Sequence, residues 1–171
     1  MRNPLGYKVL RTYQQGEEIY DLIRKFTALY LHPIKDSRLI GHMDDSGRSI
    51  PRNIMEGYGR NNTKQYLEFL GFSFGSLLEL LGDCLTLEKD IKGGQRKTKD
   101  DNGALLILSK AIKLLMGEKT MLKNQMERLE KMAGEQGLLS QNQRIAKFLE
   151  ETRRKEKEFD EWIRKQRENL S

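Results

Sequence analysis

Cysteine, histidine and proline are scarce in this 171-residue sequence, which has one cysteine, two histidines and three prolines. With Cys84 as the only cysteine, an internal disulfide and a four-cysteine zinc site are both excluded. Of the two histidines, His32 and His42, only His42 stands close to acidic residues, Asp44 and Asp45. A metal site needs three or more converging ligands, so we predict neither a metal nor a cofactor.

Long apolar runs are also missing. No stretch of about 18 apolar residues is present, which predicts that no helix spans a membrane. The first eight residues contain no apolar core of the kind that a signal peptide needs. From these features we expect a cytoplasmic protein that does not bind membranes.

Catalytic motifs are absent as well. The sequence has no nucleophile-elbow, P-loop, dinucleotide-binding or zincin pattern. Asp44, Asp45 and Glu56 are available carboxylates, but acid–base catalysis needs a pocket that shifts their pKa values, and no sequence feature indicates one. We therefore predict no catalytic residue and no enzymatic activity.

The sequence does contain five segments with helical periodicity. Apolar residues recur at spacings of three and four over about 15–31, 37–58, 62–91, 101–133 and 138–169, and no segment alternates with a period of two. The connections between the first four segments are mostly short, which favours antiparallel packing. We predict an all-α fold: an antiparallel four-helix bundle over residues 1–134, followed by a C-terminal helical extension over residues 135–171.

Two features of the last helices are unusual. The apolar seam of the fourth helix contains a single polar residue, Lys119. In the fifth helix, nine consecutive residues, 150–158, include no apolar member, so we expect this helix to project from the body or to pack on another subunit. Its apolar end, formed by Phe159, Trp162 and Ile163, is then a candidate partner-binding surface.

The charge is mildly basic, with 31 cations against 25 anions and a net charge of +6. This balance permits a nucleic-acid partner but does not require one. Two groups of cations are candidate phosphate contacts. One lies around the end of the second helix, and the other lies around a glycine-containing loop: Arg48, Arg52, Arg60 and Lys64, then Lys89, Lys92, Arg96, Lys97 and Lys99. The alternative for the loop is a solvated segment with no ligand.

The stretch from Arg48 to Arg60 places a proline inside a helical pattern. Pro51 removes one backbone hydrogen bond and should kink the helix. On a structural interpretation, Asn53 and Glu56 bond backbone groups or neighbouring side chains. On a functional interpretation, the arginines of this stretch form a basic surface for phosphates.

The same stretch, SIPRNIMEGYGR over residues 49–60, resembles the signature of bacterial four-helix bundle proteins related to the 23S rRNA intervening-sequence protein. The resemblance covers roughly residues 20–132 and includes the segments 66–70 and 75–80. It assigns motif positions to Ser49, Pro51, Asn53, Glu56, Gly57 and Gly59. The chain differs from the family in having Gly47-Arg48 where a pair of small residues is usual, and in continuing past the bundle.

The resemblance implies antiparallel four-helix bundles that assemble as pentameric rings and associate with nucleic acid. A more distant structural relative is the accessory variability protein of diversity-generating retroelements, which partners a reverse transcriptase and its RNA. We therefore expect a non-enzymatic, self-assembling protein, most simply a pentamer, that binds structured RNA, or DNA, through basic patches. The alternative is a protein-interaction scaffold, such as an accessory subunit of a retroelement reverse transcriptase.

Overall fold

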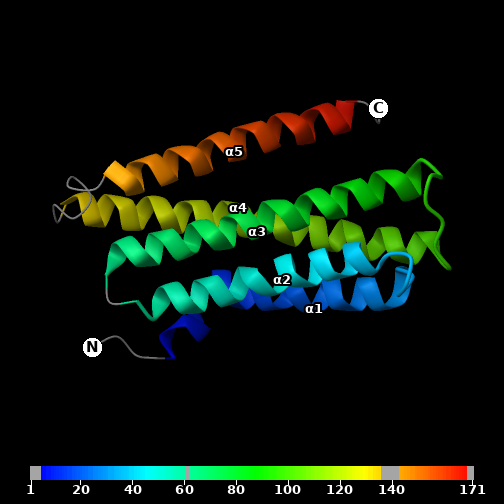
Figure 1. Ribbon diagram of the computed structural model, residues 1–171, viewed down its shortest axis with the longest axis horizontal. Coiled ribbons are helices and arrows are strands. Elements are labelled where there is room, and N and C mark those ends of the chain that lie inside the picture. The colour runs from blue at the N-terminus through cyan, green and yellow to red at the C-terminus, as the bar shows by residue number, and fades with distance from the viewer. Residues whose placement is uncertain (1–4, 61, 136–142, 169–171) are drawn as a thin grey trace.

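The computed structural model describes residues 5–60, 62–135 and 143–168 of the chain. In that part the chain forms a short 3₁₀ helix and five α-helices, and no strand. Successive α-helices run in opposite directions with their long axes nearly parallel (Figure 1). The elements in chain order are η1 (Gly6–Val9), α1 (Arg11–Tyr30), α2 (Ser37–Tyr58), α3 (Thr63–Lys92), α4 (Asp101–Glu135) and α5 (Gln143–Glu168).

The first four helices close around one hydrophobic core. α1 packs against α2 and α4, and α3 packs against the same two helices. Each helix contributes the stripe that its periodicity predicts, for example Ile19 and Ile23 of α1, Ile54 of α2 and Leu115 of α4, all of which are fully buried. The structure confirms the predicted all-α helical bundle.

The helix boundaries follow local signals. α2 has the predicted bounds, and the Asn62 side chain caps α3 by accepting a hydrogen bond from the Gln65 amide at 2.7 Å. α1 begins at Arg11, four residues before the expected start, and its early residues Thr12 and Gly16 are buried. The short helix η1 was not predicted. It is held by the ring of Tyr7, which contacts the ring of Tyr58 with 6.4 Å between centroids.

The proline in α2 lies on its buried face. α2 continues through Pro51 as one helix. A Cβ atom placed on Gly16 of α1 would lie 3.3 Å from the Pro51 ring, so the two helices meet closely there. From α3, the buried Ser73 hydroxyl donates a hydrogen bond of 2.9 Å to the Ile50 carbonyl. A bend of α2 at Pro51 stays a prediction.

The end of α2 approaches α3 even more closely. A Cβ atom on Gly57 would lie only 2.8 Å from side-chain atoms of Phe69 and Tyr66. Any larger residue would therefore push the two helices apart. This contact gives the glycine of the signature a packing role.

α5 packs on the same chain, against α3 (Figure 1). Ile163 is buried, and Phe159 and Trp162 stack with 5.6 Å between ring centroids and pack against the bundle core. In the scaffold alternative, these three side chains were a candidate partner-binding surface. Instead they fix α5 to its own bundle, because the face of α3 around Gly82 accepts the Phe159 ring.

Ion pairs complete the attachment of α5. The buried ammonium of Lys119 on α4 pairs with Asp160 on α5, which explains the polar residue in the α4 seam. Glu130 of α4 pairs with Arg153 at 3.0 Å. Side chains of the polar segment 150–158 therefore reach α4 of the same chain, which differs from the expectation that this helix projects from the body or packs on another subunit. The predicted seam residues Leu138, Ile145, Phe148 and Leu149 lie outside the described side chains.

α3 is the one described helix long and apolar enough to cross a membrane by length and composition. Of its most apolar window, 56% is buried inside the bundle. Core helices of soluble proteins pass the same test, so this finding is weak evidence for a membrane span.

Candidate nucleic-acid interface

The structure separates the predicted phosphate contacts into two groups at opposite ends of α3. Lys64 lies in the first turn of α3, beside the end of α2, whereas Lys89 and Lys92 lie in its last turn. A helix of 30 residues is about 45 Å long. The two groups therefore cannot bind the same short stretch of phosphates.

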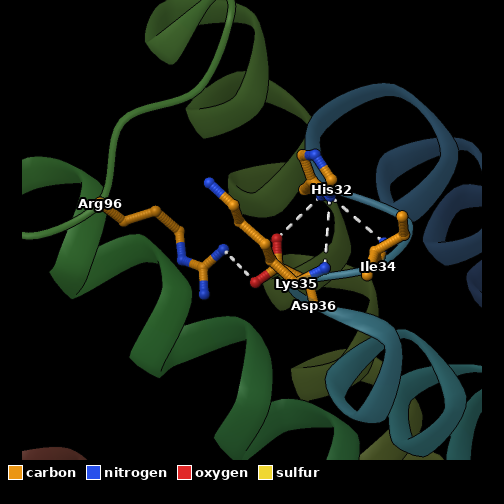
Figure 2. Close-up of polar contacts among 5 residues, drawn as sticks. All are labelled: His32, Ile34, Lys35, Asp36 and Arg96. Carbon is orange, nitrogen blue, oxygen red and sulfur yellow. Dashed lines mark hydrogen bonds and ion pairs between the residues drawn. The ribbon is translucent and has the colours of Figure 1, made fainter.

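At the loop end, Arg96 has a structural partner. Its guanidinium donates to the Asp36 carboxylate at 3.0 Å, and Figure 2 shows that this contact joins the α3–α4 loop to the α1–α2 turn. Asp36 also accepts a 2.8 Å hydrogen bond from the His32 amide, and the His32 ring accepts from the amides of Ile34 and Lys35. The turn is therefore closed around Asp36.

Electrostatics favour the charged form of Asp36. Burial by itself would raise the pKa of its carboxyl, but the hydrogen bond from His32 and the ion pair with Arg96 together hold this pKa below its ordinary value. Both side chains are largely covered, with 28% of Arg96 and 15% of Asp36 exposed. An Arg96 in this position contributes to the fold of the loops rather than to a phosphate site.

Two other cations near this loop pair with carboxylates, and a third lies against an aromatic ring. Lys92 pairs with Glu88 at 3.0 Å, Lys97 pairs with Asp101 at 3.5 Å, and the Lys99 ammonium lies 5.9 Å from the centroid of the Tyr30 ring. Hydrogen bonds from the Thr98 amide and hydroxyl lower the pKa of Asp101, so its negative charge is well maintained. Over residues 88–101 five cations face four carboxylates, and Asp36 adds a fifth. The loop is close to neutral.

The end of α2 has a different balance. Over residues 48–64 there are four cations and one carboxylate, Glu56, and Asp45 adds a second through its ion pair with Arg48. Arg48 pairs with Asp45 at 2.9 Å, and the Arg60 guanidinium lies over the Phe69 ring at 4.6 Å. Arg52 and Lys64 are exposed and make no ion pair within the described part of the chain. This end therefore keeps a positive surface.

Asn53 and Glu56, on the outward half of the signature, do not form the bonds that the structural interpretation predicts. Asn53 is half-buried and Glu56 is exposed, and within the described residues neither side chain makes a hydrogen bond. Ser49 also makes none, and Gly59 adopts an ordinary helical conformation that any residue can take. Pro51 and Gly57 are needed for packing, whereas Asn53 and Glu56 are available to a ligand or a partner.

His42 contacts a carboxylate other than Asp44 and Asp45, the acidic residues near it in the sequence. His42 Nδ1 lies 2.6 Å from Asp83 Oδ2 on α3, and this hydrogen bond raises the pKa of the imidazole. Asp44 accepts a hydrogen bond from Tyr20, and Asp45 pairs with Arg48. Among the described residues, no three His, Cys, Asp or Glu side chains converge as a metal site. Asp83 was missed because it lies 41 residues from His42.

A buried carboxyl in α4 was also missed. Glu118 is 0% exposed, and neither of its oxygens has a hydrogen-bond partner in the described part of the chain. Burial raises the pKa of this carboxyl from 4.5 to about 8. The spacing gives a signal: Glu118 follows Leu115 by three residues and precedes Leu122 by four, and both leucines are buried.

With the geometry in place, comparison with known protein families decides the family. The family model of the 23S rRNA-intervening sequence protein matches residues 8–103, more than half of the chain. This chain belongs to that family. For this intervening-sequence family member, the match spans α1, α2 and α3 and ends inside the first turn of α4. It therefore includes both ends of α3 and the outward half of the signature. No curated protein matches the chain.

Proposed function

We propose that this protein is a non-enzymatic, self-assembling bundle that binds structured RNA through the α2–α3 end. By the α2–α3 end we mean the surface formed by Arg52, Asn53, Glu56, Arg60 and Lys64. Cationic side chains there position phosphates without reading the sequence of bases. Several such surfaces on one assembly bind a long RNA more tightly than one surface alone.

The observation that carries the proposal is the uncompensated charge at this end. At the opposite end of α3, five cations face five carboxylates when Asp36 is included, whereas the α2–α3 end has three cations against Glu56. Exposed ion pairs are individually weak, but they cancel the local field that attracts phosphates. Because Arg52 and Lys64 have no carboxylate partner among the described residues, their charge is available to a phosphate.

The test compares two triple variants with the same change in net charge. R52A/R60A/K64A removes the cations of the α2–α3 end, and K92A/K97A/K99A removes three cations from the opposite end of α3. Arg96 is left in place because it holds Asp36. A labelled RNA hairpin is titrated at several salt concentrations. We expect the first variant to weaken binding and to reduce the salt slope by roughly 0.9 per lost phosphate contact.

The control variant separates this proposal from a general effect of charge. K92A/K97A/K99A should bind RNA almost as tightly as the unchanged protein. Equal losses in the two variants would mean that net charge alone drives binding, and a larger loss in the control would assign RNA binding to the loop. The native mass of each variant is measured first, so that a change in assembly is not taken for a change in contacts.

The second candidate function, a scaffold for a partner such as a reverse transcriptase, has less support. That hypothesis used Phe159, Trp162 and Ile163 as the docking surface. These side chains pack against the chain's own core, so α5 would have to leave the bundle before a partner reached them. The RNA proposal needs no such rearrangement.

A further inference from the structure

A groove of about 490 Å³ lies where the start of α1, the end of α2, the start of α3 and the last third of α4 meet. Its size is within the range of small-molecule sites, about 300–1,000 Å³. Two consecutive side-chain hydrogen bonds fix the shape of the groove. The Thr12 hydroxyl donates to Gln125 Oε1 at 2.9 Å, and Gln125 Nε2 donates to the Tyr66 hydroxyl at 2.6 Å. These bonds join α1, α3 and α4 at the groove.

The charged side chains among the described residues of the groove are all positive. Arg11 and Arg128 line it, and no Asp or Glu is among its described lining residues. Both arginines are exposed, and neither makes an ion pair within the described part of the chain. Arg11 directly precedes Thr12, and Arg128 follows Gln125 by one helical turn, so the Thr12–Gln125 bond brings both cations to the same region. Two unpaired guanidinium groups favour an anionic ligand, since they bind carboxylates through paired hydrogen bonds.

The uncharged side chains of the groove indicate which kind of uncharged group the ligand carries. They include the rings of Tyr58 and Tyr66 and the aliphatic and thioether side chains of Leu129 and Met132, of which Met132 is 54% exposed. Tyr66 is 4% exposed and its hydroxyl already bonds Gln125, so its ring offers little face for stacking a base. The half-buried Tyr58 ring already contacts the rings of Tyr7 and Tyr66, with 6.4 Å and 6.2 Å between centroids. Methionine side chains adapt to flexible apolar chains. An aliphatic body therefore fits these walls better than a nucleobase does.

We propose that this groove binds an aliphatic carboxylate, with the carboxylate at Arg11 and Arg128 and the apolar chain along Leu129 and Met132. The groove shares no residue with the α2–α3 end, so this inference goes beyond the proposed RNA function and does not depend on it.

The experiment titrates the full chain with decanoate, below its micelle concentration, in a calorimeter. We expect saturable binding of one molecule per chain. Decanol, which has the same chain without the charge, should bind at least tenfold more weakly, and adenosine monophosphate should bind more weakly still. R11A and R128A should each weaken decanoate binding about tenfold. M132E, which places a carboxylate in the groove at an exposed position, should abolish it.

The matched control is K113A, which removes one cation from an exposed position of α4 outside the groove. It should bind decanoate like the unchanged protein. Three outcomes would overturn the proposal: no saturable binding, an equal loss of affinity in K113A and R128A, or binding of adenosine monophosphate as tight as that of decanoate. Circular dichroism of each variant verifies that the helices are intact.

Discussion

The carboxyl group of Glu118 lies in the bundle core without a hydrogen-bond partner among the described residues. Its carboxyl is fully buried beside Leu115 and Leu122, and within the described residues no donor reaches either oxygen. Its sequence neighbour, Lys119, is bound to Asp160 of α5 and does not neutralise it. The protonated form is therefore favoured in the folded state, because a buried charge without a partner costs more than a neutral acid.

This environment predicts a stability that falls as the pH rises. The folded chain binds one more proton than the unfolded chain between the ordinary pKa of 4.5 and the raised value of about 8. The free energy of unfolding should therefore decrease by up to about 1.4 kcal/mol per pH unit across that window. Urea denaturation at fixed protein concentration from pH 5 to pH 8 measures this slope.

Two variants separate Glu118 from the other acids. E118L removes the ionisable group and fills its space with an apolar side chain, so the decrease between pH 5 and pH 8 should shrink to the part that the raised pKa of His42 contributes above its ordinary value of 6.5. E127Q changes an exposed acid of the same helix and should leave the decrease unchanged. If E118L keeps the slope of the unchanged protein, the carboxyl does not titrate in the core.

At the scale of elements, the least conventional contact is the one between α4 and α5. Lys119 buries its ammonium, with 8% of the side chain exposed, and depends on Asp160 for a partner. D160N should lower the free energy of unfolding by about 1–3 kcal/mol, since it leaves a buried donor without its charged acceptor. E158Q removes an exposed acid of α5 and should change stability by less than about 0.5 kcal/mol.

A second variant keeps this prediction specific. Replacing Lys119 by Met in the D160N background removes the buried charge as well as its partner. Most of the lost stability should return, because apolar packing replaces the ion pair. Hydrogen exchange of the α5 amides reports whether the loss is local. If D160N is as stable as E158Q, the Lys119–Asp160 pair does not contribute to the attachment of α5.

For the whole molecule, self-association is the prediction with the largest structural consequence. Phe72 on α3 is 47% exposed, and its ring contacts that of Phe69 with 5.8 Å between centroids. Sedimentation of the full chain at micromolar concentration should give a mass of about five times 20.0 kDa, the pentamer implied by the family resemblance. F72E should reduce this mass without unfolding the bundle, because a charge on a buried apolar interface is unfavourable.

The matched control for assembly is L106E, at an apolar position of α4 that is 73% exposed. It should leave the assembly intact. A single species near 20 kDa for the unchanged chain would refute self-association. Loss of assembly in both variants would mean that the interface is not specific to the face of α3 around Phe72.

The helices were predictable because their signals are local. Spacings of three and four residues identified all five, and the Asn62 cap and the bounds of α2 agree with the structure. The seam of α4 was also predictable, with Lys119 as a polar member, but the second buried polar residue of this helix, Glu118, was missed. Such patterns depend on neighbours within one helical turn, which the sequence contains in full.

Partners distant in the sequence were decided only by tertiary structure. Arg96 and Lys97 are adjacent cations in the sequence, yet Arg96 reaches Asp36, 60 residues away, whereas Lys97 pairs with Asp101 in its own loop. The chain alone determined an all-α bundle with two basic segments. Packing decided which segment stays positive, and it placed the apolar end of α5 on its own core. The physical reason is that charge compensation and burial depend on what faces a side chain across the bundle, and sequence spacing does not specify this.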